Sequence, residues 1–365
     1  MITRTLGCVL LLLALLIQSA RADSPEELAD LDGLRQAAAV YLDGYLDSDR
    51  LTADSLGEGV RHILDTGTGQ LPGILRRAVR SGVLLLAVAL LCGLTDSMRE
   101  SVLSASELDP VRLAGAAAVA AIAAADVNAL MGLGRQAMEQ MDGFSKLLLP
   151  AVTAACGIAG APAAAAARQA VTLMFAALLL SLATGLLIPL IYAYTAAVTA
   201  YAALGNEGLK RVGALLKWTV TGLLSFLLTG YVLALTLSGS MAGQTDVVAR
   251  KAAKTALSGM VPVVGKILAD AAEAVVAGAG LLRGTVGAVG LATVLAICLV
   301  PFLKLGAHYL IYRSAAALAA TVSPGPVSGL IDAIGSAFAL MLGMTGGSAL
   351  ILYAALITSI RAVNP

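Results

Sequence analysis

Long apolar runs dominate the chain from Ser81 onward, and they predict membrane-spanning helices. A helix needs about 20 mostly apolar residues to cross the hydrocarbon core of a bilayer. The expected helices cover approximately residues 82–98, 113–133, 147–167, 170–200, 215–238, 284–303, 305–322 and 335–358. Pro189 lies in the longest run and can either kink it or divide it into two passes. The pattern predicts an all-α, polytopic membrane bundle of about seven or eight spans.

Composition agrees with a membrane protein. The chain is 59% hydrophobic and only 13% charged, whereas an ordinary soluble domain carries about 25% charged residues. The formal net charge of +1 excludes a strongly basic nucleic-acid binder. The bilayer, and not a nucleic acid, is therefore the expected surrounding of residues 81–365.

The first 22 residues have the pattern of an export signal. Arg4 supplies a positive start, Leu6 to Ile17 form a short apolar run, and Ala20-Arg21-Ala22 fits a cleavage site with small flanking residues. The alternative is a first transmembrane helix that stays attached. Because the apolar run is short for a span, we favour a signal peptide over residues 1–22.

Residues 23–80 are expected to form an acidic, helical, extracytoplasmic segment. Apolar residues at helical spacing follow a capping box at Ser24, which predicts an amphipathic helix of roughly 20 residues. The glycine-rich stretch from Thr66 to Gly73 predicts a loop, and three arginines between residues 76 and 80 mark the edge of the bilayer. A segment this short cannot hold a large hydrophobic core of its own, so we expect it to pack on a partner or on the membrane domain. The alternative is a solvated acidic helix that has no partner.

The stretch from Ser258 to Val276, "SGMVPVVGKILADAAEAVV", interrupts the apolar pattern. Lys266, Asp270 and Glu273 share one helix face because they stand at i, i+4 and i+7. Apolar residues occupy the opposite face. Residues 245–276 therefore predict an amphipathic helical hairpin, at the membrane interface or folded into the bundle.

Glycines at four-residue spacing form two small-residue faces. These are Gly280-x-x-x-Gly284 and Gly343-x-x-x-Gly347. Small residues let helix backbones approach closely in lipid. The two interpretations are a self-association seam and packing within the bundle, and we favour packing.

Candidate chemistry is sparse. The sequence has two histidines and no nucleophile elbow, HExxH or Walker A motif. We therefore expect no enzyme, no catalytic residue, no cofactor and no metal site.

Polar residues inside the expected spans are the remaining candidates, because charge in lipid is costly. Lys304, His308 and Tyr312 stand at i, i+4 and i+8 and form one polar face, while Asp126 and Asn128 interrupt the second span. Two interpretations remain open. These side chains line a pore or transport path, or they lie near helix ends and reach toward the headgroups.

Two stretches carry a family resemblance: the one beginning at Ser258, and "TVGAVGLATVLAICLVPFLKLGAHYLIYRSAAAL". Together they resemble the stage III sporulation protein AE family of endospore-forming bacteria. The resemblance covers about residues 80 to 365, and its most specific part is Met260 to Lys266. The residues that the motif offers for interaction are Met260, Pro262, Gly265, Lys266, Asp270 and Glu273.

The resemblance implies a role in sporulation. Similar proteins lie in the mother-cell (outer forespore) membrane and belong to a channel or secretion-like complex that supports late forespore development. The implied partners are other stage III sporulation A-operon proteins, among them a secretion-type ATPase and ring-forming proteins, and indirectly stage II sporulation protein Q. The alternative hypothesis is a stand-alone transporter or permease with a polar path near Lys304 and His308.

Overall fold

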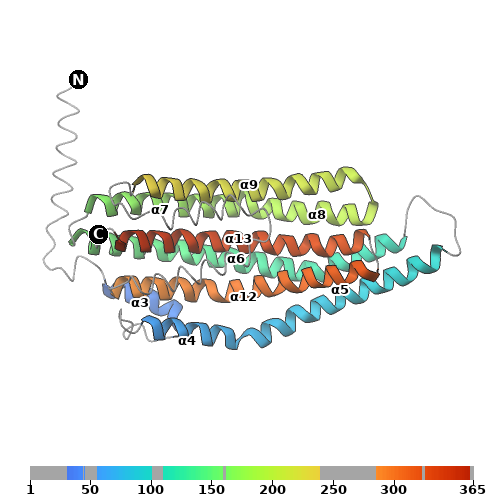
Figure 1. Cartoon of the computed structure of the whole chain (residues 1–365), viewed down its shortest axis with the longest axis horizontal. Coiled ribbons are helices and arrows are strands. Elements are labelled where there is room, and N and C mark those ends of the chain that lie inside the picture. The colour runs from blue at the N-terminus through green and yellow to red at the C-terminus, as the bar shows by residue number, and fades with distance from the viewer. Residues whose placement is uncertain are drawn as a thin grey trace, which may run out of the picture.

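The protein is an elongated bundle of helices that run side by side along its long axis (Figure 1). The structure is a computed structural model that describes residues 31–43, 45, 56–100, 110–158, 162–238, 285–322 and 325–361. The helices in these ranges are α3 (Leu31–Leu42), α4 (Leu56–Gly69), α5 (Leu71–Glu100), α6 (Pro110–Ile158), α7 (Pro162–Leu182), the π-helical turn η2 (Ala183–Leu187), α8 (Ile188–Leu204), α9 (Glu207–Ser238), α12 (Thr285–Val322) and α13 (Pro326–Arg361). The described part contains no strand, and the predicted all-α class is confirmed. The expected signal peptide and the hairpin at 245–276 lie outside the described residues.

Six helical segments are long and apolar enough to cross a membrane, judged by length and composition within the described ranges. They are Leu56–Thr95, Pro110–Thr153, Gln169–Leu204, Glu207–Leu237, Val286–Val322 and Pro326–Thr358. The eight separate helices expected from the sequence are not found, because two expected pairs are each one helix. The helix expected at 113–133 and the first part of the one expected at 147–167 belong to α6, which ends at Ile158, and the pair at 284–303 and 305–322 belongs to α12.

The continuity of α6 has a physical reason in the polar stretch between its apolar halves. Arg135 and Glu139 form an ion pair of 2.8 Å, and Lys146 and Asp142 form another of 2.7 Å. Both pairs have i, i+4 spacing, which supports a helix and does not end one. The 49 residues of α6 make a helix about 73 Å long, more than twice the roughly 30 Å of a hydrocarbon core.

Helices α12 and α13 pack against each other in the middle of the bundle. In each of them 83% of the most apolar stretch is buried, against 28–33% in the other four segments. Small residues allow the close packing of α13 on α9. A Cβ atom at Gly343 would lie 3.3 Å from Leu224, and one at Gly347 would lie 3.1 Å from Leu228. This small-residue face therefore serves packing within the bundle, as favoured from the sequence, and Gly280 and Gly284 lie outside the described residues.

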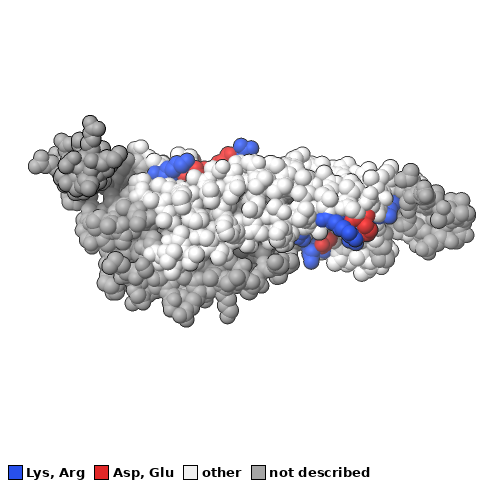
Figure 2. Space-filling view, turned by 90° about the horizontal axis from the view of Figure 1, so that it is seen from above, with Lys and Arg blue, Asp and Glu red and all other residues white. Residues whose placement is uncertain are grey.

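The outer helices present apolar side chains to their surroundings. The large exposed ones include Leu75, Val79, Val83, Leu84, Leu91 and Leu94 on α5, Met174 and Leu178 on α7, and Trp218, Phe226, Leu233 and Leu237 on α9. Figure 2 shows the consequence on one face, where charged side chains gather in two groups and a broad uncharged surface lies between them. A surface of this kind fits contact with lipid chains.

Helices α7 and α8 form one continuous rod through the π-helical turn at Ala183–Leu187. Pro189 follows this turn directly. A proline inside a helix lacks an N–H donor and clashes with the carbonyl four residues earlier, and a π-turn widens the helix where that conflict arises. The rod ends at Gly205, which has the left-handed φ of 73° and donates its N–H to the Tyr201 carbonyl. Asn206 then caps α9 by accepting a 2.8 Å hydrogen bond from the Gly208 N–H. Pro189 therefore does not divide this run into two passes.

The N-terminal helices α3 and α4 pack against the same end of the bundle. On α3, Tyr41 meets Phe144 of α6 edge to face, with ring centroids 6.1 Å apart.

The loop predicted from Thr66 to Gly73 is wrong, because the stretch ends α4, turns at Gln70 and begins α5. Gly67 is buried against Leu299 of α12, so tertiary packing outweighs the weak helix propensity of glycine. The expected domain boundary at residue 80 falls inside α5.

Candidate functional site

The polar face predicted on α12 exists as one continuous helix surface. Lys304, His308 and Tyr312 lie on successive turns of α12 and face α5 and α6. His308 is 4% exposed, and its Nδ1 atom donates a 2.8 Å hydrogen bond to the Lys304 carbonyl oxygen. This bond orients the imidazole ring, which also meets Phe338 of α13 edge to face at 6.1 Å.

Asp126 joins this face from α6. Its Oδ2 atom accepts a 2.7 Å hydrogen bond from the hydroxyl of Tyr312, which is fully buried. The Tyr312 ring packs edge to face on Phe338 with centroids 5.0 Å apart. Phe338, a residue of α13, therefore packs against the rings of both His308 and Tyr312.

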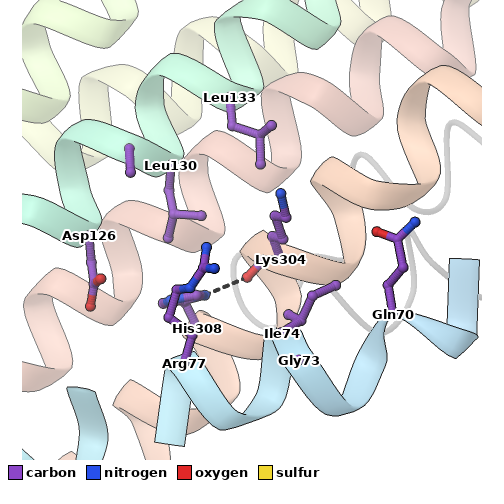
Figure 3. Close-up of a pocket in the computed structure, with 10 residues that line it drawn as sticks. Gln70, Gly73, Ile74, Arg77, Asp126, Leu130, Leu133, Lys304 and His308 are labelled. Carbon is purple, nitrogen blue, oxygen red and sulfur yellow. Dashed lines mark hydrogen bonds between the residues drawn. The ribbon is translucent and has the colours of Figure 1, made fainter. Parts of the chain in front are cut away.

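A cavity of about 370 Å³ opens between α5, α6 and α12 at this polar face. Its wall is formed by Gln70, Gly73, Ile74, Arg77, Asp126, Ala129, Leu130, Leu133, Lys304 and His308. Figure 3 shows Arg77 rising from α5 toward His308, and the Lys304 side chain extending toward α6. Three of the five polar side chains in the wall are basic, and Asp126 is its one carboxylate. We call this cavity the basic cavity.

The basic groups of this cavity have no acidic partner among the described residues. Ion pairs within 4.0 Å are found elsewhere on the described helices, and none of them includes Arg77 or Lys304. Asp126 is engaged by Tyr312 and lies apart from Lys304 in Figure 3. The cavity can therefore attract an anion, since the basic side chains of Arg77 and Lys304 face it against one carboxylate.

Sequence reasoning missed the part of this cavity that α5 contributes. The sequence pattern places Arg77 at the edge of the bilayer and predicts a loop for Gln70 and Gly73. Their spacing does carry a signal, because residues 70, 73, 74 and 77 stand at i, i+3, i+4 and i+7 and share one helix face. The shared face exists only if residues 71–80 are helical, and the loop predicted from Thr66 to Gly73 conflicts with a helix there.

Further polar contacts cross the bundle beside the cavity. Arg313 of α12 forms a 2.6 Å ion pair with Asp332 of α13, and both side chains are partly exposed. Lys217 of α9 donates a 3.1 Å hydrogen bond to the Ser336 hydroxyl of α13. These contacts tie α9, α12 and α13 together with polar groups that would otherwise be unpaired inside an apolar bundle.

The other predicted candidates are placed differently. Asn128 is exposed on α6 and is not part of the cavity wall. The motif residues lie outside the described residues: Met260, Pro262, Gly265, Lys266, Asp270 and Glu273. In the part of the chain that the structure describes, no group of three or more His, Cys, Asp or Glu side chains could hold a metal ion.

In its described residues the protein is all-helical, with six helical segments suited to spanning a membrane and a polar cavity between α5, α6 and α12. Comparison with known proteins adds the family. The family model described as Stage III sporulation protein AE matches residues 65–362, and the chain belongs to this family.

One curated relative supports the assignment. Stage III sporulation protein AE of Bacillus subtilis (strain 168) is 28% identical over 201 residues, which cover 54% of this chain and 50% of that protein. The match thus spans about half the length of this relative. No solved structure matches the chain. The predicted family is confirmed, and it implies a role in sporulation.

Proposed function

We propose that this protein is a membrane component of the channel or secretion-like complex that joins mother cell and forespore during sporulation. The observation that carries the proposal is the family match over residues 65–362. This range contains five of the six long apolar segments in full, and the first segment, Leu56–Thr95, from residue 65 onward. The proposed location is the mother-cell membrane that surrounds the forespore. The proposed role is to assemble and position other subunits, with no catalysis by this chain.

The partners proposed for this chain are other stage III sporulation A-operon proteins, including the secretion-type ATPase and the ring-forming proteins, with stage II sporulation protein Q as an indirect partner. An exposed charged segment on α6 supports contact with other chains. It contains Arg135 and Glu139, whose side chains are 58% and 48% exposed. Charged side chains in the middle of a long apolar helix must meet water or another protein, because lipid chains cannot solvate them. We call residues 135–146 the α6 charged segment.

The competing function is a stand-alone transporter that uses the basic cavity. The cavity favours this alternative, because ionisable groups between spanning helices commonly mark transport paths. The arrangement around it favours the assembly role. Phe338 backs His308 and Tyr312 on the α13 side, and Tyr312 is bonded to Asp126. His308 and Tyr312 are thus closed off on the α13 side by an aromatic ring.

Isolation of the native protein distinguishes the two functions. An affinity-tagged chain is expressed at its natural level in sporulating cells, and the membranes are solubilised in mild detergent. Co-isolation of the ATPase and ring-forming subunits is expected. The matched control is the same tag on an unrelated polytopic membrane protein. Isolation of this chain without those subunits, together with solute uptake by liposomes that contain only this chain, would contradict the proposal and favour the transporter.

A further inference from the structure

We propose that the basic cavity between α5, α6 and α12 binds the phosphate group of an anionic phospholipid. The proposal does not depend on the assembly role, because it concerns a site within this one chain. It rests on the charge of the cavity wall, on the placement of the donors and on the apolar surface beside them.

The charge of the wall favours an anion. Arg77 and Lys304 are the two strongly basic side chains of the wall, and Asp126 is its one carboxylate. Tyr312 already donates to Asp126, so part of that negative charge is satisfied within the bundle. The two cations form no ion pair with any described residue. Arg77 is exposed and Lys304 is partly buried. A partly buried cation without a counter-charge is costly, so an anion bound beside Lys304 would be stabilising.

The donors come from two helices and converge on one space. Arg77 reaches in from α5 and presents a planar guanidinium suited to two phosphate oxygens. Lys304 comes from α12 and adds a compact point charge. The His308 ring is held by its Nδ1 bond to the Lys304 carbonyl, and its Nε2 atom forms no hydrogen bond with the described residues. A phosphate group has enough oxygens to accept from both the Arg77 guanidinium and the Lys304 ammonium group.

The apolar part of the wall identifies the source of the phosphate as a lipid. Ile74, Leu130 and Leu133 line the cavity beside the basic groups. On α5, Leu75 and Val79 are 46% and 40% exposed and lie on the face of the helix that points away from the cavity. Basic cavities between spanning helices are typical sites for anionic lipid headgroups. A free phosphate ion would use the basic groups alone and would leave the apolar part of the wall without a ligand.

The volume agrees with this ligand. A cavity of about 370 Å³ lies in the lower part of the range of roughly 300–1,000 Å³ typical of small-molecule sites. It can hold a glycerophosphate headgroup, and Ile74, Leu130 and Leu133 offer apolar contact to the start of the acyl chains. The result is one bound lipid whose phosphate neutralises the two cations of the wall.

Lipid retention by the full-length protein tests the proposal. The purified chain is washed in detergent, mixed with equal amounts of phosphatidylglycerol and phosphatidylcholine, and examined by native mass spectrometry. The test variant carries Arg77→Gln with Lys304→Gln. The matched control carries Arg76→Gln with Arg80→Gln, which removes two exposed charges from α5 outside the cavity wall. The test variant should lose phosphatidylglycerol about tenfold or more, and the control should retain it as the native protein does.

A second measurement separates the two sources of phosphate. Inorganic phosphate is titrated into the lipid-free protein, and heat is recorded by calorimetry. Weak or undetectable binding is expected, because the apolar contacts are then missing. Binding of inorganic phosphate that depends on Arg77 and Lys304, without selective retention of phosphatidylglycerol, would overturn the lipid assignment. Equal loss of lipid in the test and control variants, or no preference for phosphatidylglycerol in the native protein, would overturn the site itself.

Discussion

The Tyr312 hydroxyl donates a 2.7 Å hydrogen bond to the Asp126 carboxylate, which joins α12 to α6 across 186 residues of sequence. Tyr312 is fully buried, and Asp126 is partly buried. The bond satisfies the carboxylate at the edge of the basic cavity and fixes the rotation of α12 relative to α6. It therefore links the packing of the bundle to the geometry of the candidate site.

Tyr312→Phe should destabilise the protein by about 1–3 kcal/mol, because it leaves the partly buried Asp126 carboxylate without its donor. Unfolding of the purified protein in mixed micelles, followed by circular dichroism as the denaturing detergent is raised, measures the change. Tyr309→Phe on the same helix is the control, since no described residue hydrogen-bonds its hydroxyl. The control should stay within about 0.5 kcal/mol of the native protein. Equal stability of the native protein and Tyr312→Phe would show that the bond contributes nothing.

Gly67→Ala should loosen the packing of α4 on α12. The added Cβ atom would clash with Leu299 Cδ2, so Leu299 must move in a packed region, at a cost of about 1–3 kcal/mol. Gly69→Ala is the matched control, because no atom lies within 4 Å of its new Cβ. The control should be neutral or slightly stabilising, since alanine favours a helix over glycine.

A double-mutant cycle checks the cause assigned to Gly67. In a Leu299→Ala background the obstructing side chain is absent, and the cost of Gly67→Ala should fall sharply. An unchanged cost in that background would mean that the destabilisation arises from the backbone and not from the contact with Leu299. The same unfolding measurement serves for all four proteins of the cycle.

Exchanging the charges of one ion pair tests the α6 charged segment as a contact surface. Arg135→Glu with Glu139→Arg keeps an ion pair possible within α6 but reverses the order of charges offered to a partner. The variant should accumulate normally and lose co-isolated subunits several-fold, because charges at an interface set the approach and register of a partner. The control exchanges Glu207 and Lys210 at the start of α9, which form a similar exposed pair at 3.3 Å. Undiminished co-isolation with the α6 exchange would remove this segment from the interface.

Cysteine labelling tests the placement of the N-terminal segment outside the cytoplasm. His62 is exposed on α4, and Lys210 is exposed at the opposite end of the bundle, near the α8–α9 turn (Figure 1). In a background without the four native cysteines, His62→Cys should react with a membrane-impermeant thiol reagent in intact protoplasts. Lys210→Cys should react only after lysis, in line with the bias of basic residues toward the cytoplasm. The reverse pattern would invert the topology.

The polar face of α12 could be predicted from the sequence because helical periodicity alone brings Lys304, His308 and Tyr312 together. Asp126 stood out for a similar reason, as a charge within an apolar run. Their contact could not be predicted. It depends on how two helices 186 residues apart pack and rotate, and no local pattern records that relationship.

The helix boundaries were predicted less well than the helix class, and the errors share one cause. Charged or glycine-rich stretches were interpreted as breaks between helices. In α6 the charges instead form i, i+4 pairs that sustain the helix. At Gly67 the missing side chain makes room for Leu299, so glycine serves packing there and not a turn. At Gly67 the structure depends on packing between residues far apart in the sequence. The place of Arg77 in the cavity wall depends on such packing too, so the sequence alone does not reveal it.

The length of α6 sets how far this protein can reach. If one bilayer thickness of about 30 Å is taken from a helix of about 73 Å, some 40 Å remain outside the hydrocarbon. Helices α12 and α13, with 38 and 36 residues, accompany α6 over much of this distance. A subunit that binds at the projecting end is therefore held well clear of the lipid headgroups. A bundle of this length can hold such a subunit at a distance, and shortening it by whole helical turns is expected to draw that subunit toward the membrane surface.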